Sequence, residues 1–296
     1  MTSSRAPIAA VTMVYNERVF LPMWLKYYGG ACGVENLYVF DHGSTDRSTD
    51  DHAATGYNRM RLPRTAFDDL ARAQLVQRFV NGLLEFYETV IYADADELIV
   101  PDPDAFPSLS AYAEQMQGPC AFPIGINVVH IQSAELPLDP GRPILGQRRF
   151  GRFSLNYCKP LVVRKAIGWS PGFHRSNFRP DLDPRLVLFH LKRMDAPLCY
   201  ARQQLIDEQV VWSERAIEQN WGHKQRSGAK LLETEFARDE EAFLAGPAAE
   251  WNFAEVVDAI REYPFPKVSS RGFYSWPRVK QPEALLRIPE RFYGLV

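Results

Sequence analysis

The sequence predicts an α/β fold built on an open, mostly parallel sheet that is flanked by helices. Two observations carry this prediction. Short apolar segments alternate with segments of helical periodicity, and three of the apolar segments end in clusters of polar residues. In an open parallel sheet the carboxyl ends of the strands meet along one edge, where ligands bind. The chain has 296 residues, of which 46% are apolar and 12% aromatic, so a large core can form.

The start of the chain predicts a βαβ unit, which is a strand, a helix and a second strand in that order. Ile8 to Val14 is continuous, apolar and rich in β-branched residues, which is typical of a buried parallel strand. A helix is expected over Phe20 to Ala31, because large apolar side chains recur at helical spacing and Pro22 suits a first turn. A second buried strand is expected over Asn36 to Phe40. This order indicates a right-handed crossover between parallel strands.

A second helix and a third strand follow. Thr65 and Asp68 match a helix-capping signature, and an apolar stripe of period near 3.6 continues to Phe86. The third strand is expected over Thr89 to Ala93, directly before a group of carboxylates.

Beyond Pro101 the pattern weakens, and the expected elements are shorter. Proline and glycine between Leu136 and Gly151 indicate a loop that could cover the site at the sheet edge. The other expected elements are a helix over 110–117, strands over 121–131, 159–164 and 185–190, a helix over 201–221, and a helical or irregular C-terminal extension from 246.

Composition excludes several classes of protein. The formal net charge of −2 gives no general attraction to nucleic acid, so no nucleic-acid partner is expected. Cys32, Cys120, Cys158 and Cys199 are widely spaced, which argues against a zinc ribbon and suits reduced thiols. The short apolar run after the N-terminus is expected to be neither a signal peptide nor a transmembrane segment. These features favour a soluble cytoplasmic protein and leave a peripheral membrane contact open.

Three carboxylates follow the third strand within four positions, at Asp94, Asp96 and Glu97. If the strand continues, Asp94 and Asp96 point to the same face. Two carboxylates so close repel one another unless a cation lies between them or one is protonated. A Mg²⁺ or Mn²⁺ ion would resolve the repulsion, because both prefer oxygen ligands. A solvated acidic turn is the alternative at this point.

Polar residues at the other strand ends suit a nucleoside diphosphate bound through a metal. Asp41 could accept a hydrogen bond from a uracil imide or from ribose hydroxyls. His190 offers an imidazole nitrogen as a further metal ligand, and Lys192 with Arg193 would neutralise phosphates.

Three motifs occur in order, each at an expected strand end: Met13-Val14-Tyr15-Asn16-Glu17, Phe40-Asp41-His42-Gly43-Ser44-Thr45-Asp46 and Ala93-Asp94-Ala95-Asp96-Glu97. Together they resemble the family 2 type of glycosyltransferase with the GT-A (Rossmann-like) fold, in particular a subgroup with V-x-N-E, D-x-x-S-T-D and D-x-D-E motifs. The similarity is clear over residues 8–100 and thin over 159–195.

The resemblance implies a metal-dependent, inverting enzyme that moves a hexose-type sugar from a nucleotide sugar, most simply a UDP-sugar, to a hydroxyl of a glycan, lipid or small molecule. It implies that Asp96 is a direct Mn²⁺ or Mg²⁺ ligand and that Asp94 lies between metal and ribose. His190 would be a third ligand. The nucleotide sugar would contact Val14, Tyr15, Asn16, Glu17, Asp41, Asp94, Ala95, Lys192 and Arg193.

A change in the sequence pattern near residue 120 is the best candidate for a boundary between the two halves of the fold. Residues 1–120 would bind the nucleotide sugar, residues 121–245 would form the acceptor side of the same catalytic domain, and residues 246–296 would form the extension. The family's Glu-Asp catalytic pair has no counterpart before His190. The candidates for the base are therefore His174, which follows a glycine- and aromatic-rich segment, and Asp195 or Asp181.

Two other functions stay open at this stage: a non-catalytic nucleotide- or glycan-binding protein with the same fold, and a phosphatase of the haloacid dehalogenase type that uses Asp94 as nucleophile. Several residues also have structural interpretations. Asp46 is expected to cap a following helix. Arg148, Arg149 and Arg152 are expected to form a solvated loop face, with binding of an acceptor phosphate as the alternative.

Overall fold

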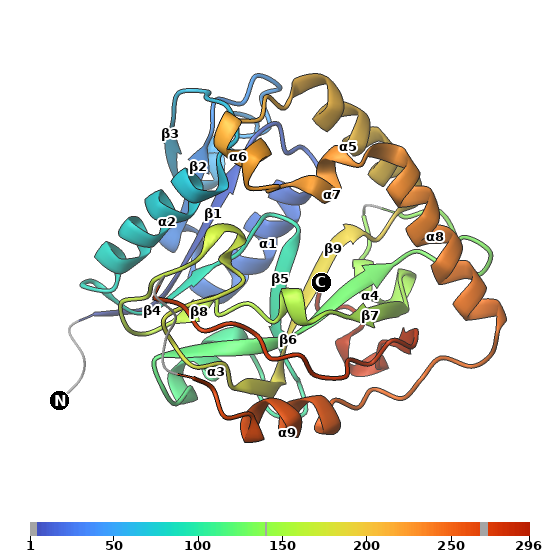
Figure 1. The fold of residues 1–296 in the computed structure, drawn as a ribbon. Helices are drawn as coiled ribbons and strands as arrows, with labels where there is room; N and C mark the ends of the chain where they lie inside the picture. Colours follow the sequence, from blue (N-terminus) through green and yellow to red (C-terminus); the bar gives the residue numbers. More distant parts are fainter. Residues whose placement is uncertain (1–4, 140, 267–271) are drawn as a thin grey trace.

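The computed structural model describes residues 5–139, 141–266 and 272–296 of the protein (Figure 1). Residues 1–4, 140 and 267–271 belong to the expected N-terminus, loop and C-terminal extension, and they lie outside the described residues. The predicted α/β fold is confirmed, because the described residues form a ten-stranded sheet flanked by helices.

The N-terminal part of the sheet is parallel, as predicted. Strands β1 (Ala6–Val14), β2 (Leu37–Asp41) and β4 (Tyr87–Tyr92) lie within a few residues of the expected positions. They pair in the order β4-β1-β2, and helix α1 (Phe20–Cys32) makes the crossover between β1 and β2. A short strand that the sequence analysis missed, β3 (Asn58–Arg61), adds to the edge of β2 in parallel.

Beyond β4 the sheet is mixed, so the expectation of a mostly parallel sheet holds for the N-terminal part only. Strand β9 (Leu182–Arg193) lies between two partners, antiparallel to β5 (Glu97–Pro101) and parallel to β6 (Cys120–Val129). The remaining pairs are antiparallel and involve β7 (Phe150–Phe153), β8 (Val162–Val163) and β10 (Leu286–Arg287).

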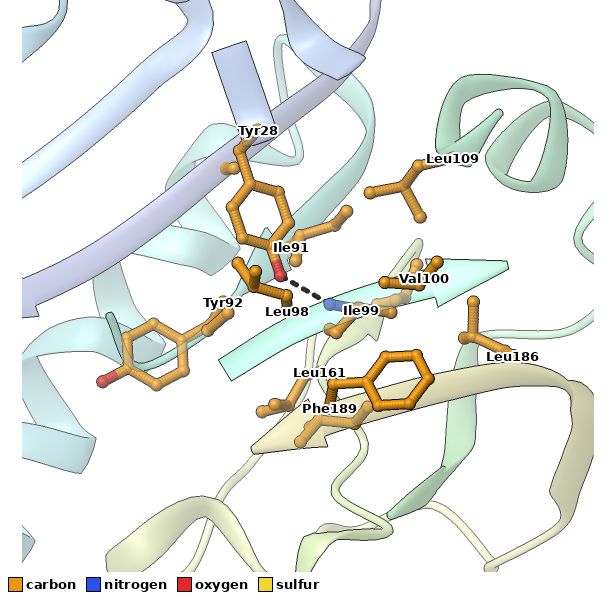
Figure 2. Packing of buried hydrophobic residues seen from close by; sticks show 14 of the residues in the cluster. Tyr28, Ile91, Tyr92, Leu98, Ile99, Val100, Leu109, Leu161, Leu186 and Phe189 are labelled. Carbon is orange, nitrogen blue, oxygen red and sulfur yellow. Dashed lines mark hydrogen bonds between the residues drawn. The ribbon is translucent and has the colours of Figure 1, made fainter. Parts of the chain in front are cut away.

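The carboxylate-rich segment is a turn and not the continuation of a strand. The backbone N–H of Glu97 donates to the carbonyl of Asp94 at 2.9 Å, and β5 begins at Glu97. Figure 2 shows how β5, which follows the turn, is held by α1: the Tyr28 hydroxyl accepts from the N–H of Ile99 at 3.0 Å. Packing of β5 between α1 and β9 therefore fixes Asp94 and Asp96 at the sheet edge.

Helix α2 (Asp69–Leu83) begins later than predicted. Asp68 is its N-cap residue and accepts from the N–H groups of Leu70 and Ala71 at 3.0 and 2.9 Å. Thr65, the expected cap, instead contacts the His42 ring with its hydroxyl at 3.0 Å. The capping signature was therefore read three residues too early.

The expected helix over 201–221 is divided into two. Helix α5 (Ala196–Gln209) ends before Val211, whose carbonyl accepts from the N–H of Phe67. Ser213 donates its N–H to the Phe67 carbonyl and its side chain caps α6 (Glu214–Glu218). The segment between the helices thus pairs with the chain before α2.

The remaining helices are α3 (Leu109–Gln115), α4 (Ile144–Gln147), α7 (His223–Arg226), α8 (Gly228–Leu244) and α9 (Ala254–Glu262). In Figure 1, α5, α6 and α7 lie in the upper part of the view, α8 descends along its right side, and α9 lies at the bottom. Within the described residues, no helix has the length and apolar character needed to cross a bilayer.

The loop over residues 136–151 packs on the protein and does not cover the site. Arg148 is fully buried, against the expectation of a solvated face, and donates to the Leu136 carbonyl and to Asp195 at 2.9 Å each. Within the described part of this loop, no residue lines the cavity described next.

Candidate active site

A cavity of about 1200 Å³ opens at the carboxyl ends of β1 and β4. Its lining comes from residues between Met13 and Glu283, so all three predicted parts of the chain contribute. Most residues singled out from the sequence line it, namely Val14, Tyr15, Glu17, Asp94, Ala95, Asp96, His174, His190, Lys192 and Arg193. The candidates Asn16, Asp41, Asp181 and Asp195 do not line it.

Asp94 is neutralised by protein cations. Its carboxylate accepts from the Tyr92 hydroxyl at 2.7 Å and from Arg72 at 3.1 Å, and the Lys159 ammonium lies 3.4 Å away. Burial alone would raise the pKa of Asp94, but the Arg72 and Lys159 cations hold that pKa well below its usual range. Asp94 is therefore an anion whose charge is already balanced.

Asp96 and His190 lie next to each other in the wall of the cavity. His190 Nε2 lies 3.8 Å from Asp96 Oδ2, and the Asn127 side-chain oxygen accepts from His190 Nδ1 at 2.7 Å. The imidazole also stacks on Tyr157, with ring centroids 3.9 Å apart. Burial lowers the pKa of His190 to about 3, so the ring is neutral and its Nε2 lone pair points towards Asp96.

This pair fits a divalent ion, whereas Asp94 does not join it. Two donor atoms 3.8 Å apart can share an ion with bonds of about 2.1 Å. A metal-binding histidine usually donates its other ring N–H to an oxygen, as His190 does to Asn127. The described residues contain no group of three or more His, Cys, Asp or Glu side chains placed to hold a metal. An ion held by Asp96 and His190 would therefore need oxygen atoms of a bound molecule to complete its coordination.

Glu97 belongs to a buried ion pair beneath the turn. Its Oε1 lies 2.5 Å from the Lys159 ammonium, and both side chains are almost fully buried. Burial raises the pKa of Glu97 to about 7, although the Lys159 charge opposes this shift. No role for Glu97 follows from the sequence, and in the structure its carboxylate holds Lys159 beside Asp94.

Arg202 of α5 connects the first and third motifs. It donates to Glu17 Oε2 at 2.6 Å and to Asp96 Oδ2 at 3.0 Å. Burial raises the pKa of Glu17, and the Arg202 charge opposes that shift. Glu17 also accepts from the N–H of Phe20, so it caps the start of α1. Arg202 thus places a cation next to the proposed metal ligand.

His174 lines the cavity with one ring nitrogen fixed. The Asn156 carbonyl accepts from Nδ1 at 2.7 Å, which leaves Nε2 as the hydrogen-bond acceptor. Burial, with a smaller contribution from the Lys159 charge, lowers the pKa of His174 to about 4. The ring is therefore neutral near pH 7 and able to accept a proton.

Asp41 and Asn16 serve the loop after β2 rather than the cavity. Asp41 is fully buried, and its two carboxylate oxygens accept from the Ser44 N–H at 2.7 Å and the Thr49 hydroxyl at 2.8 Å. The Asn16 side-chain oxygen accepts from the Thr45 N–H at 2.8 Å. Both side chains are thus hydrogen-bonded within the protein, and neither lines the cavity.

The other candidate carboxylates also have structural partners. Asp195 is the N-cap of α5, where it accepts from the Leu198 N–H at 3.0 Å and pairs with Arg148. Asp181 is exposed and pairs with Arg261. Asp46 accepts from the Ser48 N–H, but the helix that it was expected to cap does not form, since turns follow. The structure therefore leaves His174 as the cavity-lining candidate base.

Lys192 and Arg193 have different surroundings although they are adjacent. Lys192 lines the cavity near Arg202 and Asp96 and, among the described residues, forms no ion pair. Arg193 donates to Asp239 of α8 at 3.1 Å. Lys192 is therefore the cation available to a ligand at Asp96, while Arg193 is held against α8.

Three cations of this site, Arg72, Lys159 and Arg202, are not predicted from the sequence. The motif carboxylates that they bind lie between 22 and 185 residues away along the chain, so no local pattern reveals these pairs. A weak signal existed for Lys159, a cation at the start of an expected strand in a chain with three clustered carboxylates that need neutralising.

Comparisons with known proteins give a limited likeness. No protein-family model and no curated protein sequence matches the chain. Glucosyl-3-phosphoglycerate synthase from Mycobacterium tuberculosis, solved with Mn²⁺, UDP and glucosyl-3-phosphoglycerate, is 19% identical over 41% of this chain and 44% of that chain, with a TM-score of 0.29. A mannosyltransferase from Pyrobaculum calidifontis, solved with GDP-Man and Mn²⁺, is 14% identical over 68% of this chain and 61% of that chain, with a TM-score of 0.37.

The match thus spans less than two thirds of either protein's length. At these scores the likeness assigns no substrate and no residue role, so the proposals below rest on the residues of the cavity.

Proposed function

We propose that this protein is a glycosyltransferase that transfers a hexose-type sugar from a nucleotide sugar, with a UDP-sugar as the favoured donor, to a hydroxyl acceptor. The observation that carries the proposal is the pair Asp96 and His190, with His190 Nδ1 anchored on Asn127. Asp96 lies at the turn after β4, in the third of three family 2-like motifs, and His190 lies beside it on β9. The ordered motifs support a GT-A type of fold and an inverting reaction.

The donor would occupy the strand-end side of the cavity. Asp96 and His190 would hold Mn²⁺ or Mg²⁺ together with diphosphate oxygens, and the ion would supply charge neutralisation for the leaving nucleotide. Lys192 adds a cation that has no carboxylate partner among the described residues. Tyr15, Val14 and Ala95 line the same side, and Arg64 stacks on the Tyr15 ring at 3.6 Å from its centroid.

His174 is the proposed general base. Its neutral Nε2 would take the proton from the acceptor hydroxyl as that oxygen bonds to the anomeric carbon. The bond from the anomeric carbon to the diphosphate breaks at the same time, and its electron pair leaves with the nucleotide. Attack from the face opposite the leaving group inverts the anomeric centre.

The test is donor binding and turnover by the Asp96→Asn variant. We expect wild-type protein with Mn²⁺ or Mg²⁺ to bind UDP-sugar and release UDP, and chelation of the metal to abolish both. Removal of the charged ligand should lower turnover at least about 100-fold. The exposed Asp51→Asn variant is the matched control and should behave as wild type. Unchanged metal-dependent binding and turnover in Asp96→Asn would contradict the proposal.

A second candidate function is nucleotide binding without transfer. One observation favours it: a His174 pKa near 4 makes a weaker base than an ordinary histidine. Binding of UDP with Mn²⁺, without turnover across a broad acceptor panel, would support this alternative.

A further inference from the structure

The wall of the cavity that is formed by β7, the end of β9, α8 and the C-terminal segment is basic. Arg152, Arg193, Arg238 and Lys280 all line the cavity there, and we call them the basic wall. Two cavity-lining carboxylates, Glu235 and Glu283, and the buried Asp239 lie among them. Four cations against three carboxylates leave one net positive charge, before Lys192 is counted.

Asp239 organises two of these guanidinium groups. It is fully buried on α8, and its two oxygens bind Arg152 Nε and Arg193 Nη1. Arg152 also donates to the carbonyls of Glu283 and Arg238. Each guanidinium carries five N–H donors in a plane, so both keep donors beyond those bonded to Asp239. A buried carboxylate that orients two arginines in a cavity wall makes a prearranged site for an anion.

The remaining two cations are free to move to a ligand. The Arg238 side chain is 56% exposed and reaches Asp239 only at 3.9 Å. Lys280 forms no ion pair within the described part of the chain and lies beside Gln281, whose side chain accepts from the Leu155 N–H. Substitution of these two side chains therefore breaks no buried contact.

The basic wall lies apart from the diphosphate position. Arg193 follows His190 by three residues along β9, which separates them by about 10 Å at the usual rise of a strand. An ion on Asp96 and His190 holds phosphate oxygens within about 2 Å of itself. The basic wall therefore suits a second anion, on the other substrate.

The proposed base and the basic wall are joined by one segment. Residues 152–157 line the cavity almost continuously, with Arg152 at one end and Asn156, which holds His174, near the other. Four residues span at most about 14 Å. An acceptor of modest size can thus reach His174 with a hydroxyl and the basic wall with an anionic group.

We propose that the basic wall binds a phosphate or carboxylate group of the acceptor, so that the acceptor is an anionic hydroxyl compound. This inference rests on the proposed glycosyltransferase function and specifies its acceptor class.

The first experiment compares matched acceptors with a UDP-sugar and Mn²⁺. The panel pairs glycerol with glycerate and glycerol phosphate, and glucose with glucuronate and glucose 6-phosphate. We expect an at least tenfold higher kcat/KM for the anionic members. A preference for phosphates or for carboxylates within the panel identifies the group. Equal use of the neutral and anionic members would overturn the proposal.

The second experiment uses the Arg238→Ala, Lys280→Ala double variant. Its KM for the anionic acceptors should rise at least tenfold, with a smaller change in kcat. Arg47→Ala, which removes a 75% exposed cation outside the cavity, should leave both parameters at wild-type values. An unchanged KM in the double variant would also overturn the proposal.

A third measurement separates this inference from the proposed function. Calorimetry with inorganic phosphate, in the presence of UDP and Mn²⁺, should detect binding to wild-type protein that weakens at least tenfold in the double variant. If no nucleotide sugar binds or reacts, the proposed function fails. Titration of the protein alone with phosphate then still tests whether the basic wall binds an anion. Equal phosphate binding by both proteins would refute the anion site.

Discussion

His174 owes its position to a glycine two residues before it. Gly172 has φ of 72°, and a Cβ at this position would lie 2.7 Å from His174 Cδ2 and 2.8 Å from Nε2. A side chain at residue 172 is therefore incompatible with the observed position of the imidazole.

We predict that Gly172→Ala lowers kcat at least about tenfold, because misplacement of a general base by a fraction of an ångström is costly. The backbone strain of alanine at positive φ should also cost about 1–2 kcal/mol of unfolding free energy. Gly56→Ala is the control, since Gly56 has φ of 92° and open space around its Cβ position. Equal kcat in the two variants would show that the imidazole is not fixed by Gly172.

The depressed pKa of His174 predicts two pH effects of known sign. Because the folded-state pKa is about 4, the base stays neutral and kcat should stay level from pH 7 to about 5. An unfolded histidine has a pKa near 6.5, so between these values the unfolded chain binds more protons and stability falls as the pH is lowered.

At pH 5 this linkage should cost the wild type about 2 kcal/mol relative to pH 7. Urea unfolding of wild type and His174→Gln at both pH values measures the difference. The variant should lose less stability on acidification. An identical loss in both proteins would mean that His174 is not held neutral by the fold.

At the residue scale, the sequence indicated which charged residues lie near the sheet edge, but not which of their side chains point into the cavity. Asp96 was correctly placed at the cavity because its motif ends a strand. Asp41 ends a strand and Asp195 follows one, yet each carboxylate accepts a hydrogen bond from a backbone N–H group of the protein. For Asp195 a local signal existed, since Asp195-Ala196-Pro197 reads as an N-cap followed by proline in the first turn.

At the scale of elements, a buried carboxylate of α8 binds two arginines of the sheet, beside the packing of Phe243 on Phe150. Asp239 binds Arg152 of β7 and Arg193 of β9, and its side chain is fully buried. We predict that Asp239→Asn lowers the free energy of unfolding by roughly 3–5 kcal/mol, because two buried cations lose their counter-charge. The measurement is urea unfolding.

Asp51→Asn removes a carboxylate that is 47% exposed and pairs with Arg47 at 3.4 Å. It should cost less than about 1 kcal/mol. If Asp239→Asn costs no more than Asp51→Asn, the ion cluster does not hold α8 in place.

Among the elements, the parallel strands and α1 were predictable because each is a continuous apolar or periodic segment. β5 was missed because its apolar residues, Leu98 to Val100, directly follow the acidic turn, so the sequence has no separate signal for the start of a new strand. The interruption between α5 and α6 was missed because its cause is pairing of residues 211 and 213 with Phe67, far away in sequence.

At the scale of the molecule, the cavity joins residues from the first motif to the C-terminal segment. Ligand bound there should stabilise the whole fold, by about 2.7 kcal/mol at a concentration 100 times the dissociation constant. We predict that UDP with Mn²⁺ raises the Tm of the wild type and raises it less for Asp96→Asn. Equal shifts in both proteins would place nucleotide binding away from Asp96.

The long-range ion pairs of the cavity also fix an order of assembly. During synthesis Asp96 and Glu97 emerge well before their partners, because Lys159 follows Glu97 by 62 residues and Arg202 follows Asp96 by 106. Arg202, the partner of Glu17, follows it by 185 residues. A nascent chain that has completed β1, β2 and β4 therefore carries Glu17 and Asp96 without their arginine partner until α5 leaves the ribosome. The cavity is complete only after residues 279–283 have followed.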